Sequence, residues 1–211
     1  MYTLYYSPAT ASKVVHHMLK ELRVPHELRL VDIDTGAQKD PEYLRLNPNG
    51  QVPTLVVDGR PMYEAAAITL FLADRHPDAN LAPAIADDER RATYLQWMFH
   101  LANTLQPAFR LWFYAKDLPH VDHATVKADV QACIEAVWDR VESHLVAANS
   151  SYMLGASVSA LDLYLVMLMR WSRNMPKPAT EWPRVASVAH RVKETTSWKN
   201  MNAAEGNTDW P

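Results

Sequence analysis

The sequence predicts an α/β unit over residues 1–79, followed by an all-helical unit over residues 85–211. Up to about residue 80, short apolar runs alternate with stretches of helical periodicity, whereas no strand pattern follows Asp87. Between the two parts, "HPDANLAPA" has the polar, proline-rich composition of a linker. Because 48% of the 211 residues are hydrophobic, the chain can bury a sizeable core.

The first unit has the order β-α-β, then α, then β-β-α, which predicts a mixed sheet covered by helices. The expected elements are residues 2–6 (strand), 12–23 (helix), 26–33 (strand), 40–46 (helix), 53–63 (hairpin) and 64–76 (helix). Asp58-Gly59 marks the hairpin turn, and Pro25 and Pro77 follow the ends of two of the helices.

The second unit shows only helical patterns. The expected helices cover residues 87–116, 123–147, 159–171 and 182–196. Pro107 should kink the first of them. Ser159 and Asp162 have the spacing of a capping box just before an apolar run, so we expect Asp162 to be structural rather than a catalytic acid. Gly155 nearby should supply an unusual backbone angle.

The composition excludes several classes of function. A net charge of −3 and a pI near 6.3 give no electrostatic basis for binding nucleic acid or an anionic membrane. The longest apolar run, residues 161–169, is too short to span a bilayer and contains an acid. The N-terminal residues lack the features of a signal peptide, and the single cysteine, Cys133, cannot form an internal disulfide. We therefore expect a cytoplasmic protein.

Motifs for other chemistries are not found in the sequence. It has no G-x-G-x-x-G, no P-loop lysine motif and no C-x-x-C. His16 and His17 are adjacent on a predicted helix and so point to different faces, and the other histidines show no ligand spacing. We therefore expect no metal.

The stretch "NPNGQVPTL" raises a specific question. Its first half reads as a turn, because Asn and Gly tolerate positive φ and Pro48 fixes φ. Pro53 does not fit a central strand, since proline cannot donate to a sheet ladder. The Val52-Pro53 pair must therefore stand at the first residue of a strand, at a sheet edge or at a cis bond.

This pattern resembles the cytosolic glutathione transferases over the whole chain. The most specific part is "YLRLNPNGQVPTLVVDGRPMYEAAAITLFLADRHP", and a second match is "YMLGASVSALDLYL". The residues of the matching stretches are most similar to those of bacterial, beta-class-like members. The resemblance implies a thioredoxin-like glutathione-binding domain over residues 1–79 and an all-helical domain over residues 85–211 that forms a hydrophobic substrate pocket.

The resemblance also implies a role for the loop at Pro53. A cis bond there would turn the backbone of Val52 outward, where an extended peptide can pair with it like an added strand. Glutathione is such a peptide, and Gln51, Val52 and Pro53 are its expected contacts. The alternative is that Pro53 merely begins a strand.

The two ends of glutathione have expected partners as well. In the family, an acid at the start of the third helix meets the γ-glutamyl amine, and the next residue meets its carboxylate; here these positions are Glu64 and Ala65. Ala65 replaces the usual serine or glycine, so a hydroxyl contact is missing. Lys39 is the expected partner of the glycyl carboxylate, with a solvated surface lysine as the alternative.

Thiol activation is expected in the loop "YYSPATASK". A free cysteine thiol has a pKa near 8.5, and a hydroxyl donor at a helix N-terminus stabilises the thiolate. Where beta-class members have a cysteine, the ungapped match falls on Ala11. We rank Thr10 first, for its proximity to that position, then Ser7 and Ser12. All three are also residue types that an N-cap requires.

In the helical unit, beta-like members carry an asparagine and a histidine that reach the active site. The ungapped match places Phe99 and Gln106 there. The expected hydrophobic pocket contains Gln106, Phe109 and Phe113, which implies a hydrophobic electrophile.

The resemblance therefore predicts a bacterial glutathione S-transferase of the detoxification type. It would be a homodimer that uses glutathione as a co-substrate and needs no other cofactor. One alternative is a glutathione-dependent thiol-disulfide reductase or peroxidase, which the missing cysteine disfavours. The other is a non-catalytic binding or regulatory member, favoured by the departures at Ala11, Ala65 and Gln106, which are also compatible with weak or atypical activity.

Overall fold

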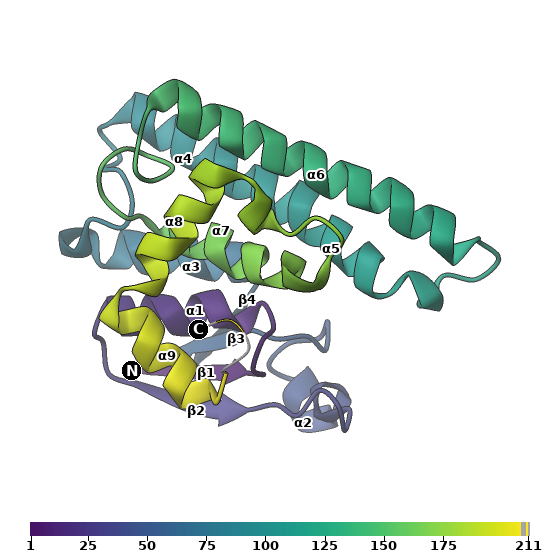
Figure 1. Cartoon of the computed structure of the whole chain (residues 1–211). Helices are drawn as coiled ribbons and strands as arrows, with labels where there is room; N and C mark the ends of the chain where they lie inside the picture. The colour runs from purple at the N-terminus through teal and green to yellow at the C-terminus, as the bar shows by residue number, and fades with distance from the viewer. Residues whose placement is uncertain (208–209, 211) are drawn as a thin grey trace. The chain divides into compact units, whose positions relative to one another are not determined.

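The computed structural model describes residues 1–207 and 210. The chain divides into two compact units (Figure 1). The first contains Met1–Ala82 together with the C-terminal segment that begins at Lys193, and the second contains Pro83–Val192. The sequence assigned everything after residue 85 to the helical unit, so the location of the C-terminal segment differs from that expectation.

The first unit is built on a four-stranded sheet with the strand order β2-β1-β3-β4. The strands are β1 (Tyr2–Tyr6), β2 (His26–Leu30), β3 (Thr54–Val57) and β4 (Arg60–Tyr63). β1 pairs with β2 in parallel and with β3 antiparallel, so that Leu4 lies between Leu28 and Leu55. The predicted mixed sheet is confirmed. β2 ends earlier than expected, because the Asp32 carboxylate accepts hydrogen bonds from the N–H groups of Asp34 and Thr35 and turns the chain.

Helices cover this sheet. They are α1 (Ser12–Glu21), α2 (Pro41–Leu44), α3 (Ala65–Arg75) and α9 (Thr196–Glu205). α1 packs against α3 and α9, and its residues from Ser12 to Leu19 are all buried. Three expected helices of this unit are thus present, each shorter than predicted at its C-terminal end.

α9 covers the polar face of α1. Lys13 donates through Nζ to Asn202 Oδ1 at 2.5 Å and lies 3.6 Å from the Glu205 carboxylate. Glu205 also contacts His16 Nδ1 at 2.8 Å. All of these groups are buried. This contact gives the buried ammonium of Lys13 and the Nδ1 atom of His16 polar partners, whereas the buried Nε2 atom of His16 has none among the described residues.

The sequence did not predict α9 as a separate helix. The structure contains α8 (Pro183–Lys193) and then α9, in place of one helix over residues 182–196. Thr195 caps the second helix by accepting a hydrogen bond from the N–H of Trp198, and Gly206 ends it with φ +66°. Both are recognised helix-end signals.

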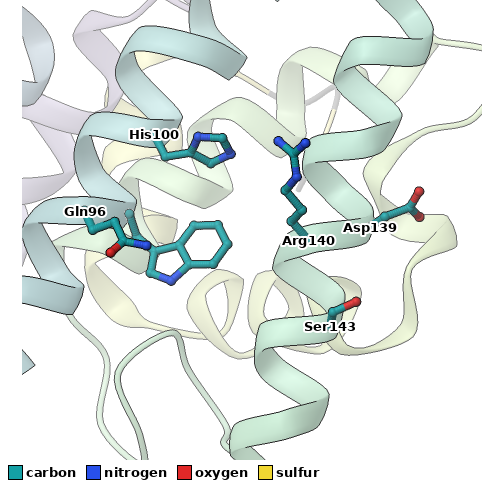
Figure 2. Close-up of a pocket in the computed structure, with 6 residues that line it drawn as sticks. Gln96, His100, Asp139, Arg140 and Ser143 are labelled. Atoms are coloured by element: carbon teal, nitrogen blue, oxygen red, sulfur yellow. The ribbon is translucent and has the colours of Figure 1, made fainter.

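The second unit is helical. It contains α4 (Asp88–His100), a π-helical segment (Leu101–Leu105), α5 (Gln106–Phe113), α6 (His123–Ala148), α7 (Ala160–Trp171) and most of α8. The expected kink at Pro107 takes the form of this wider π turn, because proline lacks an N–H and its ring displaces the preceding carbonyl groups. Between α4 and α6 the unit is hollowed by a pocket of about 470 Å³ (Figure 2).

α7 is the core of the second unit. Every residue from Ala160 to Arg170 is buried. The predicted capping box is present, and Asp162 also accepts a hydrogen bond from the N–H of Met153 at 2.8 Å. Complete burial raises the pKa of Asp162 to about 6, although its hydrogen bonds with Met153 and Ser159 favour the ionised form. Gly155 has φ +126°, as expected.

Within the described residues, no helix is both long and apolar enough to cross a bilayer. The same residues include no group of three or more histidine, cysteine, aspartate or glutamate side chains that could hold a metal ion.

Candidate functional site

The loop before β3 presents an unpaired backbone. The Val52-Pro53 peptide bond is cis. Gln51 is fixed by its carbonyl oxygen, which accepts hydrogen bonds from the Tyr43 hydroxyl at 2.6 Å and from Asn47 Nδ2 at 2.8 Å. By contrast, the N–H and C=O of Val52 form no hydrogen bond with any of residues 1–207 or 210. This backbone can therefore pair with an extended peptide.

The turn that leads into this loop requires glycine. Gly50 has φ +57°, and a Cβ atom there would lie 2.9 Å from the carbonyl oxygen of Gln38. The Lys39 side chain crosses the same turn, with Nζ 3.4 Å from the carbonyl oxygen of Asn49. The predicted anion partner Lys39 is thus placed beside the turn that precedes Val52.

Glu64 and Ala65 lie at the same end of the sheet. Tyr63 pairs with Thr54, so Glu64, one residue beyond, is level with Pro53. Glu64 has φ +74° and ψ 110°, a conformation that non-glycine residues rarely adopt. Its side chain is exposed, whereas Ala65 is buried at the first position of α3. Backbone of this kind is concentrated at ligand sites.

The loop after β1 meets the same edge. Tyr5 pairs with Thr54, so the chain that leaves β1 at Ser7 lies beside the Val52-Pro53 loop. The register therefore brings together three segments that are distant in the sequence. They are the predicted thiol loop, the peptide-docking loop and the start of α3.

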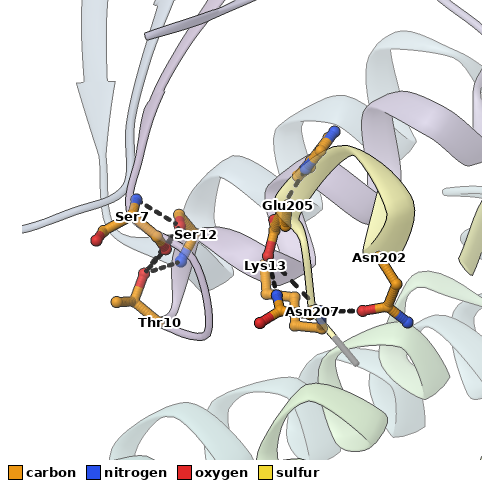
Figure 3. Close-up of polar contacts among 8 residues, drawn as sticks. Ser7, Thr10, Ser12, Lys13, Asn202, Glu205 and Asn207 are labelled. Atoms are coloured by element: carbon orange, nitrogen blue, oxygen red, sulfur yellow. Dashed lines mark hydrogen bonds and ion pairs between the residues drawn. The ribbon is translucent and has the colours of Figure 1, made fainter. Parts of the chain in front are cut away.

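The predicted catalytic hydroxyls form a compact network (Figure 3). Thr10 Oγ1 donates to the carbonyl oxygen of Ser7 at 2.7 Å, and Ser12 Oγ donates to the same oxygen at 2.8 Å. The two hydroxyls are 2.8 Å apart, and Ser12 Oγ accepts a hydrogen bond from the N–H of Ser7. Each hydroxyl hydrogen thus has an acceptor within the loop. Ser12 is completely buried and holds the loop in shape.

The Ser7 hydroxyl differs from the other two. It has no hydrogen-bond partner in the described part of the chain, and it points away from Thr10 and Ser12 (Figure 3). None of the three hydroxyl residues is the N-cap of α1, because Ala11 occupies that position. Thr10 Oγ1 nevertheless accepts a hydrogen bond from the N–H of Ser12, the first residue of the helix. Ala9 is left-handed, with φ +66°, and turns the loop towards α1.

The predicted pocket residues belong to the second unit. Gln106, Phe109 and Phe113 share one helix face. Gln106 Oε1 accepts a hydrogen bond from the Tyr164 hydroxyl. Phe109 is completely buried among aromatic rings, including Trp171 at a centroid distance of 5.9 Å, whereas Phe113 is 39% exposed. Phe109 is therefore a core residue, and Phe113 presents the apolar surface.

Sequence reasoning missed the residues that hold the docking loop. Asn47 was available as a signal, since an asparagine that begins a turn commonly bonds the N–H two residues later, and it does so here with Asn49 at 3.1 Å. Tyr43 could not have been found. Its hydroxyl reaches Gln51 and Thr54 only through the tertiary fold.

Comparison with known proteins agrees with this geometry. A model of the family described as glutathione S-transferase, N-terminal domain, matches residues 10–75. Glutathione S-transferase GST-4.5 of Xanthomonas campestris pv. campestris is 32% identical over 171 residues, which cover 80% of this chain and 81% of that protein.

Two solved structures are similar over nearly the whole chain. A ternary complex of BphK, a bacterial GST, is 31% identical, has a TM-score of 0.85, and covers 97% of this chain and 99% of its own. A glutathione transferase homologue from Sulfitobacter, solved with bound glutathione, is 26% identical with a TM-score of 0.87, covering 97% and 98%. From the aligned sequence, the fold and the arrangement of the site, the chain belongs to the glutathione S-transferase family.

Proposed function

We propose that the protein binds glutathione at the sheet edge formed by Val52-Pro53 and Glu64-Ala65, and transfers its thiolate to a hydrophobic electrophile. One observation carries the proposal. The unpaired backbone of Val52, the start of α3 and the loop after β1 lie at the same end of one sheet. The solved Sulfitobacter homologue contains bound glutathione, which supports the same ligand here.

Each part of glutathione has a partner of suitable chemistry. The cysteinyl backbone pairs with the N–H and C=O of Val52, beside Gln51 and Pro53. The Glu64 carboxylate receives the γ-glutamyl ammonium, and the free N–H groups at the start of α3, from Ala65 on, receive its carboxylate. The Lys39 ammonium turns from the Asn49 carbonyl oxygen to the glycyl carboxylate.

The reaction needs a thiolate. A hydroxyl that donates to sulfur lowers the thiol pKa, and the thiol proton passes to solvent. Ser7 can donate as it stands. Thr10 can donate only when Ser12 keeps the hydrogen bond to the Ser7 carbonyl oxygen. The thiolate sulfur then forms a bond to the electrophilic carbon, and the leaving group departs with the electron pair of the broken bond.

A second candidate is glutathione binding without turnover. It is favoured by the hydroxyl network, in which Thr10 and Ser12 both have acceptors inside the loop. This candidate shares the binding site with the first and differs only in the state of the bound thiol.

Two measurements separate the candidates. Calorimetry with glutathione tests binding, and Glu64→Gln should weaken it about tenfold because a charge-assisted contact is lost. The matched control is Glu42→Gln, at an exposed glutamate on α2, which should bind as the wild type does. Turnover of 1-chloro-2,4-dinitrobenzene then tests transfer: binding with no turnover supports the second candidate, and no binding contradicts both.

The activating hydroxyl is identified by titrating the bound thiol. We expect Ser7→Ala or Thr10→Ala to raise its pKa by about one to two units, as the loss of one charge-assisted hydrogen bond implies. Thiolate absorbance against pH is the measurement, and Thr35→Ala, at an exposed threonine of the same unit, is the control. Unchanged pKa values in both variants would show that neither side chain activates the thiol.

We also propose a homodimer in the cytoplasm. Large apolar side chains are exposed in both units, including Tyr63, Phe99 and Val146, the last at 54%. Sedimentation at micromolar concentration should give twice the mass of the 24.0 kDa chain. A species of single-chain mass alone would contradict this.

A further inference from the structure

The hydroxyl of Tyr43 bridges the two residues that flank Val52-Pro53. It donates to the carbonyl oxygen of Gln51 at 2.6 Å and lies 2.9 Å from Thr54 Oγ1. Tyr43 belongs to the short helix α2 and is only 6% exposed. A single buried phenol therefore holds the chain on both sides of the backbone that is proposed to receive glutathione.

The hydrogen bonds of this bridge run in one direction. A phenol has a single hydrogen, and here it points to Gln51, so the Tyr43 oxygen accepts from the Thr54 hydroxyl. Asn47 supplies a second donor to the Gln51 carbonyl oxygen, at 2.8 Å from Nδ2, so that both lone pairs of this oxygen are occupied. Burial raises the pKa of Tyr43, which keeps its hydroxyl protonated at neutral pH. The result is a hydrogen-bond relay from Thr54 through Tyr43 to the Gln51 carbonyl.

The Gln51 carbonyl controls the Val52 N–H, because the two groups belong to one peptide unit. The bond between these residues is trans. In a planar trans peptide the C=O and the N–H point in opposite directions. Since two hydrogen bonds hold the carbonyl towards Tyr43 and Asn47, the Val52 N–H must point away from them, where it has no partner among the described residues. Reversal of this peptide plane would break both bonds.

The same two bonds should make the Val52 N–H a stronger donor. Hydrogen bonds that are linked in a series polarise and strengthen one another. An amide whose carbonyl already accepts two bonds therefore has a more positive hydrogen than an amide whose carbonyl accepts none. The relay thus provides both the direction and the strength of the donor in the docking loop.

We propose that Tyr43 is a positioning residue for glutathione binding, which acts through the Gln51 carbonyl to orient and polarise the Val52 N–H. The inference rests on the proposed function, in which this N–H donates to the cysteinyl backbone of glutathione. Tyr43 acts without touching the ligand. If the hydroxyl served stability alone, its removal would lower the melting temperature and leave the affinity for glutathione as it is.

The test variant is Tyr43→Phe, which removes the hydroxyl but keeps the ring that packs against Tyr5 at a centroid distance of 5.9 Å. Calorimetry should show glutathione binding that is weaker by about five- to tenfold, as the loss of one hydrogen bond implies. Because the thiol loop is unaltered, the KM for glutathione should rise while kcat is preserved. The pKa of the bound thiol should also be unchanged.

Tyr2→Phe is the matched control. Tyr2 is 7% exposed, and its hydroxyl lies 2.8 Å from His76 Nε2. It pairs with Val57, at the end of β3 that is remote from Thr54. Both variants lose the same atom from a buried position beside the same sheet, so both should lower the melting temperature. Only Tyr43→Phe should lower the affinity for glutathione, and equal affinity in the two variants would overturn the proposal.

Thr54→Val tests the direction of the relay. Valine keeps the shape of threonine but cannot donate to the Tyr43 oxygen, so glutathione binding should weaken about twofold. In the double variant Tyr43→Phe/Thr54→Val, the second substitution should cost no further affinity, because its effect passes through the hydroxyl that is already missing. Additive losses would show that Thr54 acts by another route, and would contradict the relay.

The ligand-free protein gives a second readout. The nitrogen-15 and proton chemical shifts of the Val52 amide report on the hydrogen bonds of its peptide unit. Tyr43→Phe should change both shifts, and Tyr2→Phe should change neither; unchanged shifts in Tyr43→Phe would contradict the proposal. If the wild type does not bind glutathione, the proposed function fails as well. If the wild type binds and Tyr43→Phe binds equally tightly, only this inference fails.

Discussion

Each compact unit buries an ionisable side chain whose pKa is strongly displaced, and acid affects the two in opposite ways. In the first unit this group is His17 on α1, whose Nε2 lies 3.1 Å from Ser197 Oγ on α9. In the second it is Asp162 at the start of α7. Burial lowers the pKa of His17 to about 3, with further contributions from Lys13 and His16, and raises that of Asp162 to about 6.

Burial is the main cause of both pKa shifts, and only the sign of the charge on the ionised group differs. Burial penalises the charged form, which is the protonated form of histidine and the deprotonated form of a carboxylic acid. The stability that His17 contributes is complete above its unfolded pKa of 6.5 and is lost as the pH falls towards 3. The stability that Asp162 contributes is complete below 3.8 and is lost as the pH rises through about 6. Acidification should therefore weaken the first unit through His17 while it strengthens the second through Asp162.

The largest effect is expected for His17. Between pH 6.5 and pH 4, its depressed pKa should lower the free energy of unfolding of the first unit by about 3 kcal/mol. Hydrogen exchange of α1 amides measures this unit separately. His17→Gln keeps a polar group near Ser197 but cannot become charged, so its α1 protection should lose this dependence on pH. An equally steep dependence in the variant would assign the effect to another group.

Asp162 should give a smaller effect of opposite sign. Between pH 4 and pH 6 its ionisation should lower the stability of the second unit by about 2 kcal/mol. Exchange of α7 amides is the measurement. Asp162→Asn should be less stable overall because the capping contacts are altered, but the slope with pH should disappear. Retention of that slope would contradict the prediction.

The smallest predicted change in stability is that of Ser159→Ala, which affects only the second of the two units. Ser159→Ala removes the hydroxyl that donates to the Asp162 carboxylate at 2.6 Å. Loss of this cap should cost about 1 kcal/mol at neutral pH. It should also raise the pKa of Asp162 further, because one bond to its ionised form is gone. α1 protection serves as the internal control and should be unchanged.

The two units also differ in how they bury their helices, and this difference explains which helices the sequence could predict. α7 was readily found, because its buried face is apolar and a capping box precedes it. α9 was missed, because several of its buried positions are polar, including Ser197, Asn202 and Glu205. Apolar periodicity cannot reveal a helix that packs through charged and amide groups. Its partners on α1 are recognisable only after folding.

In the candidate site, too, the sequence could predict some residues and could not order others. Pro53 and Gly50 could be singled out from backbone requirements alone, since proline cannot donate and a turn tolerates positive φ at glycine. The roles of Ser7, Thr10 and Ser12 could not be ordered, because the three hydroxyls lie within six residues and differ only in their acceptors. Which of the three hydroxyl hydrogens already has an acceptor depends on how the loop folds back on the Ser7 carbonyl oxygen.

The position of α9 has a consequence for synthesis on the ribosome. The second unit is continuous in the chain, whereas the first is completed by the segment that begins at Lys193. Nascent domains generally fold as units as they emerge. Here the first unit to emerge cannot be finished before the second has been synthesised, because Lys13, His16 and His17 lack their partners on α9 until that helix has left the ribosome. Chaperones that bind nascent chains would meet α1 with its polar face uncovered, and the helical unit can mature ahead of the segment that precedes it.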